Sequence, residues 1–360
     1  MNPVHPMLTN IHALGDPATW QKSIELADEA LSNWPMTRHR FKQIYFVGHG
    51  SSLYNGLVGE YIVEVITGIP SKAIPAFAFL TYMEQRQLDS QTLVIGISTT
   101  GETRSVCDAL ERASQAGAST LAITAHQDTA ITRRAETVIT TGGEDDRISV
   151  KTKSYVQALI SIYSLALHLA NDPQLRNSWL VQLHLAAQGA GHFLGEQWSQ
   201  IKQLAEKYGS APKVFVLGTG PNLGTAEEAS LKIIEMAKMY SECQELEDFF
   251  HGRLREVDQH SPMFFIAPQG GASDRILDFL TVTDMIKAPS VVITDNVTPG
   301  IQRLATHVVM MPVSLEELAT PLLYILPMYI FGYEMALQRG HDPTARRYNL
   351  VPQNIRFQDK

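Results

Sequence analysis

The chain has 360 residues and a mass of 39.9 kDa, which is enough for two domains that each bury a core of their own. A hydrophobic fraction of 44% and a charged fraction of 18% are typical of a globular protein and exclude a disordered or fibrous chain. The net charge of −8 argues against binding to nucleic acid or to anionic membranes. An anionic ligand would therefore have to be recognised by a local site.

The two cysteines, Cys107 and Cys243, lie far apart in the chain and lack the spacing of metal ligands. This pattern predicts neither a disulfide framework nor a zinc site, and it is typical of the reducing cytoplasm. The N-terminal residues lack a basic segment followed by an apolar one, and Pro327 and Gly332 interrupt the longest apolar run, 321–333. We therefore expect a cytoplasmic protein with no membrane partner, in which this run forms a buried helix.

The chain opens with residues 1–37, which we expect to form a helical arm. From residue 38 onward, runs rich in Val, Ile and Phe alternate with segments of helical period, which is the pattern of an α/β fold with parallel sheets. We place a first domain at 38–175, connecting helices at 176–209, a second domain at 210–345 and an irregular tail at 346–360.

Two strand-like runs of the first domain end in small and hydroxyl-bearing residues. The run FVG (46–48) leads through His49 into Gly50, and the run LVIGI (93–97) leads directly into STTGET. Ligands of open parallel sheets bind beyond the carboxyl ends of the strands, where loops lead into helix N-termini. Both turns are therefore expected at the same edge of one sheet.

Backbone N–H groups at a helix start, together with hydroxyl donors, can bind an anion such as phosphate. We predict a phosphate cradle built from the hydroxyls of Ser98, Thr99, Thr100, Thr103 and Ser52, with Gly50 and Ser51 beside them at the same edge. The alternative is a polar turn that caps the following helix, since Ser and Thr are favoured there.

Three pairs of segments repeat at one constant offset along the chain. FVGHGSS (46–52) matches VLGTGPN (216–222), LVIGISTTG (93–101) matches FFIAPQGG (264–271), and TLAITAH (120–126) matches SVVITDN (290–296). Three matched strand ends at one offset predict a duplication. The expected fold is α/β, with two tandem domains, each a parallel sheet flanked by helices in a three-layer α/β/α arrangement.

The duplication provides an internal comparison for the proposed cradle. Where the first copy has STTGET, the second has PQGGAS, in which only Ser273 keeps a hydroxyl. A turn that merely capped a helix would need hydroxyls in both copies. The difference favours phosphate binding by the first copy.

The richest ionisable cluster lies early in the second copy. Glu228, Lys232 and Glu235 are spaced by four and three residues, so we expect them on one helix face, near the start of that helix. Their apolar neighbours favour an internal cleft over an exposed, salt-bridged face. His251 precedes Gly252 at a predicted loop edge, where it is either structural or the acid/base partner of a half-buried glutamate.

Other cofactor motifs are not matched. GHGSSL lacks the third glycine of a dinucleotide-binding loop, GTGPNLG has the wrong spacing, and the sequence contains no Walker A, HExxH or nucleophile-elbow motif. We expect neither a cofactor nor a metal ion.

The motifs GHGSSLYNG, GISTTGET, EEASLKIIE and EDFFHG, with the tail HDPTARRY, resemble those of the tandem sugar isomerase (SIS) domain family. The chain is similar to the isomerase half of glucosamine-6-phosphate synthase and to the deglycases that act on fructoselysine 6-phosphate and fructose-aspartate 6-phosphate. The resemblance covers nearly all of the chain.

The resemblance implies roles for the residues already singled out. Glu235 would transfer a proton between C1 and C2 of the open-chain sugar, His251 would assist ring opening, and Glu228 and Lys232 would bind or orient the sugar. The substrate phosphate would be held by Ser52, Ser98, Thr99, Thr100 and Thr103. The resemblance also implies a homodimer, in which the His251 loop reaches the active site of the neighbouring subunit.

The sequence departs from the relatives it resembles in three places. No glutaminase domain precedes the tandem copies, so we do not expect a whole amidotransferase. Arg346, Arg347 and Tyr348 stand where the synthase has a ring-opening lysine and resemble the deglycase tails; the arginines either close over the substrate or dock on the second copy. Arg253 replaces the usual proline after His251-Gly252 and either contacts an anionic group of the substrate or is solvated.

These features together predict a deglycase that cleaves a 6-phosphorylated ketosamine, a glycated amino acid, to glucose 6-phosphate and free amine. An aldose–ketose sugar-phosphate isomerase or an amino-sugar-phosphate deaminase is the alternative, because the same proton transfer serves all of these reactions. A non-catalytic phosphosugar sensor is the alternative from another class, and the presence of both Glu235 and His251 argues against it.

Overall fold

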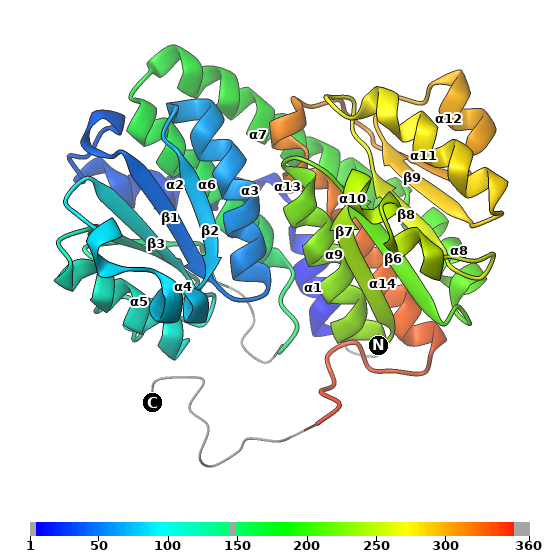
Figure 1. Cartoon of the computed structure of the whole chain (residues 1–360), viewed down its shortest axis with the longest axis horizontal. Helices are drawn as coiled ribbons and strands as arrows, with labels where there is room; N and C mark the ends of the chain where they lie inside the picture. The colour runs from blue at the N-terminus through cyan, green and yellow to red at the C-terminus, as the bar shows by residue number, and fades with distance from the viewer. Residues whose placement is uncertain (1–4, 144–147, 349–360) are drawn as a thin grey trace. The chain divides into compact units, whose positions relative to one another are not determined.

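The computed structural model describes residues 5–143 and 148–348 and contains two five-stranded parallel sheets (Figure 1). The chain divides into two compact units. The first-sheet unit consists mainly of residues 18–143 and 153–181, and the second-sheet unit of residues 5–17, 148–152 and 182–347. We describe each unit by itself.

The first sheet has the strand order β2-β1-β3-β4-β5, with every neighbouring pair parallel. Its strands are β1 (Gln43–Gly48), β2 (Ser71–Pro75), β3 (Thr92–Ile97), β4 (Ser119–Thr124) and β5 (Thr137–Thr140). The helices of this unit are α2 (Pro17–Ser32), α3 (Ser51–Thr67), α4 (Ala76–Tyr82), α5 (Arg104–Gln115), α6 (Lys153–Ala170) and the first part of α7 (Pro173–Glu196).

Helices cover both faces of the first sheet because successive side chains of a strand point to opposite sides. In β1, Phe46 packs against glycines of α3, whereas the next residue, Val47, belongs to a core cluster with Phe79 of α4 and Leu110 of α5. All residues of β3 and β4 are buried, as expected for strands enclosed on both faces. The predicted three-layer α/β/α arrangement is confirmed.

The second sheet has the order β7-β6-β8-β9-β10 and is also entirely parallel. Its strands are β6 (Lys213–Gly218), β7 (Tyr240–Glu245), β8 (Met263–Ile266), β9 (Ser290–Thr294) and β10 (His307–Met310). The helices of this unit are α1 (Pro6–Ala13), the rest of α7, α8 (Trp198–Tyr208), α9 (Asn222–Ala237), α10 (Leu246–Phe250), α11 (Ser273–Met285), α12 (Pro299–Leu304), α13 (Pro321–Tyr324) and α14 (Leu326–Gln338).

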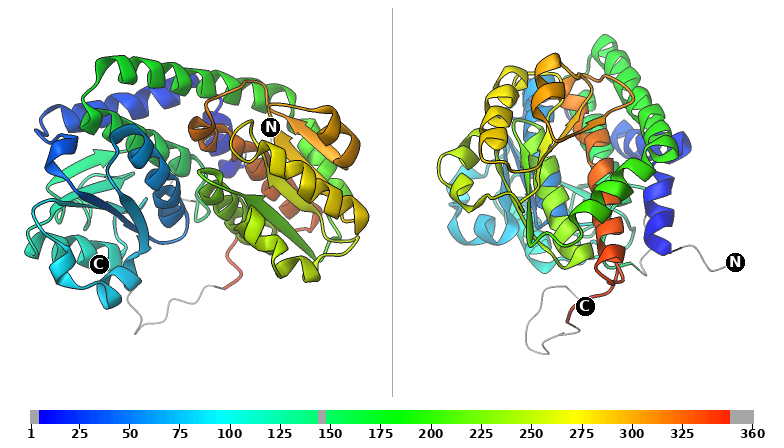
Figure 2. Two further views of the ribbon diagram at one scale, coloured as in Figure 1. Left: turned by 45° about the horizontal axis from the view of Figure 1, so that its top comes forward. Right: turned by 90° about the vertical axis from the view of Figure 1, so that its right-hand side faces the viewer.

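The two sheets repeat one topology at the offset predicted from the sequence. That offset carries Gln43, where β1 begins, onto Lys213, where β6 begins, and it carries Thr137 of β5 onto His307 of β10. The strand order is the same in both copies, and Figure 2 shows helices on both faces of each sheet. The duplication is confirmed, while the domain boundaries at 38, 175, 210 and 345 stay predictions.

The long apolar run forms α13 and the first part of α14. Residues 326–336 are all buried, because α14 packs against α8 and α9. Pro327 does not interrupt the helix, because it lies in the first turn, where its missing N–H has no partner to lose. Among the helices that the structure describes, none is long and apolar enough to cross a membrane.

The turn after β3 depends on Gly101. Its φ of +70° lies in the left-handed region, and an added Cβ would lie 2.1 Å from Thr129 Oγ1. Both the backbone conformation and the close approach of Thr129 therefore require glycine. This turn places the hydroxyls of the loop 98–103 at the carboxyl edge of the sheet.

We predict that Gly101→Ala destabilises the protein by more than Gly117→Ala. Gly117 has a φ of +87° but no atom within 4 Å of an added Cβ, so its replacement costs only the backbone term of about 1–2 kcal/mol. At Gly101 the collision adds roughly 1–3 kcal/mol. Urea unfolding of both variants measures the difference, and equal losses would contradict this account of the turn.

Candidate functional site

The loop after β3 holds a compact group of hydroxyls. Ser98 is buried with 3% exposure, and its Oγ lies 2.9 Å from Thr103 Oγ1 and accepts a hydrogen bond from the Gly101 N–H at 3.2 Å. Thr100 Oγ1 accepts from the Glu102 N–H at 3.3 Å. Thr99 and Thr100 are half-buried at the end of the strand. The loop is thus ordered by its own polar groups.

Helix capping alone does not account for these hydroxyls. Thr103 occupies the N-cap position of α5, yet its side chain makes no capping hydrogen bond and contacts Ser98 instead. The hydroxyl is therefore held beside the helix N-terminus and the positive end of its dipole, which is the arrangement that an anion site needs.

The loop after β1 reaches the same edge, since β1 and β3 are paired neighbours. Gly50 has a φ of +52° and precedes α3, so Ser51 and Ser52 lie in the first turn of that helix, where both are half-buried. The structure therefore brings the two predicted hydroxyl loops to adjacent strand ends.

His49 connects these loops and was not singled out from the sequence. Its Nε2 lies 2.8 Å from Ser105 Oγ, in the first turn of α5. Desolvation lowers the pKa of His49 below its usual value, which favours the neutral form of the imidazole. The sequence did contain a signal for His49, because a titratable residue stands there between two glycines at the end of a strand.

The predicted charged cluster of the second copy lies on α9. Glu228 and Lys232 are buried, with side-chain exposures of 0% and 2%, whereas Glu235 is 33% exposed. Lys232 Nζ lies 2.5 Å from Glu235 Oε2 and 3.6 Å from Glu228 Oε1. The three side chains share one face, and the ammonium is shared between two carboxylates.

The expected position of this cluster along its helix was wrong. α9 begins at Asn222, directly after the turn that follows β6, so the cluster occupies the middle and the last turn rather than the start. Glu235 consequently lies two residues before the helix end at Ala237. Pro221 at the N-cap was the sequence signal for the true start, because proline is tolerated at the beginning of a helix.

Tyr329 of α14 completes the buried cluster and was also missed. Its hydroxyl lies 3.2 Å from Glu228 Oε1 and 3.1 Å from the Thr152 carbonyl oxygen. A buried carboxylate needs such donors to offset its lost hydration. In the sequence, Tyr329 is indistinguishable from the other aromatic residues of its apolar run.

The structure does not bring His251 to this cluster. The side chain is 73% exposed at the end of α10, with Nε2 3.8 Å from Glu247 Oε1. Arg253 forms an ion pair with Glu242 and is 53% exposed. The loop that carries both residues therefore faces solvent.

The tail reaches the end of α9. Arg346 and Arg347 are exposed, and Arg347 Nη2 donates to the Lys238 carbonyl at 3.4 Å. Lys238 ends the helix in the left-handed region, at φ +53°, and its Nζ donates to the Glu235 carbonyl. Burial lowers the pKa of Lys238, and the negative charge of Glu235 opposes that shift. Two cationic side chains thus lie around the helix end that carries Glu235.

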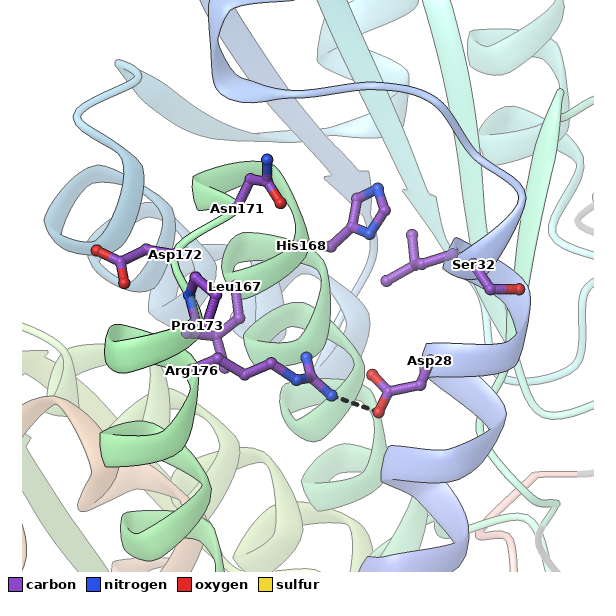
Figure 3. A pocket seen from close by; sticks show the side chains of 9 residues that line it. Asp28, Ser32, Leu167, His168, Asn171, Asp172, Pro173 and Arg176 are labelled. Carbon is purple, nitrogen blue, oxygen red and sulfur yellow. Dashed lines mark hydrogen bonds and ion pairs between the residues drawn. The ribbon is translucent and has the colours of Figure 1, made fainter.

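A separate pocket of about 310 Å³ lies between α2 and the turn from α6 to α7 (Figure 3). Arg176 pairs with Asp28 across it, and His168 Nε2 lies 2.9 Å from the Trp34 carbonyl oxygen. None of the predicted site residues lines this pocket. Within residues 5–143 and 148–348, no group of acidic, histidine or cysteine side chains is arranged to hold a metal ion.

Comparison with known proteins gives the same division of the chain into two copies. Residues 39–168 and 207–339 each match the model of the SIS domain. Glutamine–fructose-6-phosphate aminotransferase [isomerizing] of Methanothermobacter thermautotrophicus is 28% identical over 344 residues, which are 94% of this chain and 55% of that protein. The chain spans about half the length of the curated relatives it matches.

Two solved structures show the same fold. The C-terminal domain of glucosamine-fructose-6-phosphate aminotransferase from Francisella tularensis superposes with a TM-score of 0.82 at 19% identity, over 96% of this chain and 99% of that one. Glucosamine-6-phosphate deaminase from Thermotoga maritima gives a TM-score of 0.71 at 23% identity, over 91% and 96%.

We predict that Tyr329→Phe lowers the free energy of unfolding by about 1–3 kcal/mol, because buried Glu228 and the Thr152 carbonyl lose the hydroxyl donor that lies within reach of both. Tyr208→Phe is the matched control: its hydroxyl is buried without a hydrogen-bond partner among the residues described, so its removal is expected to be neutral or slightly stabilising. Denaturant unfolding compares the two variants. Equal effects would show that the Tyr329 hydroxyl does not support the cluster.

Proposed function

The chain belongs to the SIS domain family, and on this premise we propose that it is an enzyme whose substrate is a 6-phosphorylated ketosamine. The names of its relatives refer to fructose 6-phosphate and glucosamine 6-phosphate, that is, to phosphorylated sugars that receive or lose an amino group. The phosphate of a glycated amino acid combines a phosphorylated sugar with an amino group, because its amine is attached to C1 of the sugar phosphate.

The observation that carries the proposal is the setting of Glu235. One carboxylate oxygen is held 2.5 Å from the buried Lys232 ammonium, while a third of the side chain stays exposed. A general base must be oriented and also accessible to the proton that it removes. Glu235 meets both requirements, whereas Glu228 is fully buried and serves to hold the ammonium.

In the proposed reaction Glu235 removes a proton from C1 of the open-chain ketosamine, which gives an enaminol, and returns it to C2. The product is an imine at C1. Water adds to this carbon, the C–N bond breaks, and the products are the free amine and glucose 6-phosphate. One water is consumed, and there is no net oxidation or reduction.

The hydroxyl loops of the first copy would bind the substrate phosphate. Ser52, Ser98, Thr99, Thr100 and Thr103 offer neutral donors beside two helix N-termini, and they form an anion site in a chain of net charge −8. Phosphate binding far from C1 and C2 holds the sugar in place for the proton transfer.

The preference for a deglycase over an isomerase or deaminase rests on the two arginines of the tail and on the amino acid that a ketosamine carries at C1. Arg347 contacts the carbonyl of Lys238, three residues after Glu235, and Arg346 precedes it. Guanidinium groups at this position suit the carboxylate of an amino acid attached to C1. A simple sugar phosphate has no carboxylate for these guanidinium groups to bind.

The proposed enzyme acts as a homodimer. His251 is 73% exposed at the end of α10, so the imidazole is accessible to a second subunit. There it would assist ring opening as an acid or base.

The test is an assay coupled to glucose 6-phosphate, with fructosyl amino acid 6-phosphates offered beside fructose 6-phosphate and glucosamine 6-phosphate. The proposal requires glucose 6-phosphate and free amine from a fructosyl amino acid 6-phosphate. Turnover of the simple sugar phosphates alone would assign an isomerase or deaminase instead, and binding without turnover of any compound would assign a sensor.

We predict that Glu235→Gln lowers the turnover number by about 10²- to 10⁴-fold, because an amide cannot accept the C1 proton. Substrate binding should change little, since the glutamine carbonyl can still accept from Lys232. Glu206→Gln, an exposed position on α8, is the matched control and should retain full turnover. Steady-state kinetics and calorimetric binding of the same variants give both readouts; unchanged turnover in Glu235→Gln would exclude this base.

A further inference from the structure

The second copy contains the counterpart of the phosphate loop, and its backbone donors are already occupied. Residues 268–273 follow β8 as residues 98–103 follow β3, and they lead into α11 as the first loop leads into α5. Three consecutive N–H groups of this loop, those of Gln269, Gly270 and Gly271, donate to side-chain oxygens within the same unit, at 2.8, 2.8 and 2.9 Å.

Two of the three acceptors are carboxylates. Gln269 N–H donates to Asp295 Oδ1, and Gly271 N–H donates to Glu317 Oε2. The Glu317 carboxylate packs directly against the loop, since a Cβ added to Gly270 would lie 2.2 Å from Glu317 Cδ and 2.3 Å from its Oε2. An anion supplied by the protein thus lies where the loop presents its backbone donors to the helix start.

The first copy has different residues at the positions of these carboxylates. At the offset that relates the two copies, Asp295 corresponds to Ala125 and Glu317 to Arg147. Arg147 lies outside the described residues. Asp295 therefore has a neutral counterpart in the first copy, whereas its own carboxylate would repel a phosphate in the second.

Space for a ligand remains next to the second loop. A pocket of about 620 Å³ is lined by Gln269, Gly270, Ser273, Asp274 and Leu277 on one side and by residues 296 and 298–300 on the other. Without Glu317, the backbone donors of the loop and the helix start of α11 could bind a phosphorylated compound, and the Asp274 carboxylate in the lining would weaken that binding.

We propose that the second copy holds an anion site closed by the protein's own Glu317, so that each chain binds one phosphorylated substrate, in the first copy. The assignment of the substrate to the first copy rests on the proposed function. The closure of the second-copy loop by Glu317 does not depend on it. Glu317 determines how many phosphates the chain binds and which of its two similar loops receives the substrate.

The test measures the number of phosphates bound per full-length chain by isothermal titration calorimetry, with inorganic phosphate and glucose 6-phosphate as probes. The wild type should bind one. Glu317→Ala should bind two, the second more weakly. Glu316→Ala is the matched control and should bind one, because the side chain of Glu316 is exposed and makes no hydrogen bond to the loop among the described residues. Two sites in the wild type, or no additional site in Glu317→Ala relative to the wild type, would overturn the proposal.

The outcome also separates this inference from the proposed function. If the wild type binds no phosphate and Glu317→Ala binds one, the first-copy cradle is wrong while the closure by Glu317 stands. If the wild type binds one phosphate that is lost in Ser98→Ala with Thr103→Ala, the cradle stands whatever Glu317→Ala does.

A second pair of variants tests the contact without any ligand. Gly270→Ala should lower the melting temperature by about 2–4 °C in the wild type, because its Cβ must displace the Glu317 carboxylate from its backbone donor. In the Glu317→Ala background the same substitution should have little effect. Equal shifts in both backgrounds would show that Glu317 does not fill the loop.

Discussion

Parallel pairing of the strands is the constraint on which the rest of the molecule depends. Because every strand in a sheet points the same way, every loop that follows a strand and starts a helix lies at one edge. β1 and β3 are neighbours in the first sheet, and β6 and β8 are neighbours in the second. The same pairing therefore brings two hydroxyl loops together in one copy, and the start of α9 beside a carboxylate-filled loop in the other.

The buried ammonium of Lys232 positions the carboxylates on α9 in the second copy. A buried ammonium is costly unless it is paired, and removing one partner of a buried ion pair typically costs about 3–5 kcal/mol. Lys232 lies between Glu228, which receives support from Tyr329, and Glu235, which reaches solvent. The interior groups thus keep one exposed carboxylate in a defined position, and the mobility of a glutamate side chain is reduced at the point where proton transfer is proposed.

Duplication followed by local substitution explains how two similar sheets can do different work. The strand order and the constant offset between the copies were retained, whereas side chains at the carboxyl edge changed in type. Hydroxyls at the strand end favour an external anion, whereas carboxylates of the protein that accept from the backbone N–H groups replace it. The loop of the second copy keeps the geometry of an anion site but takes its anion from Glu317.

The sequence by itself determined the fold class, the duplication, the hydroxyl loop and the spacing of Glu228, Lys232 and Glu235, because periodicity, offset and i,i+4 spacing are local properties of the chain. Only the tertiary structure decided which distant groups meet these residues. Tyr329 lies 101 residues from Glu228, and Glu317 lies 46 residues from Gly271. Neither has a local signature, since an aromatic residue in an apolar helix and a glutamate in a loop are ordinary until packing of the chain places their polar atoms against a partner.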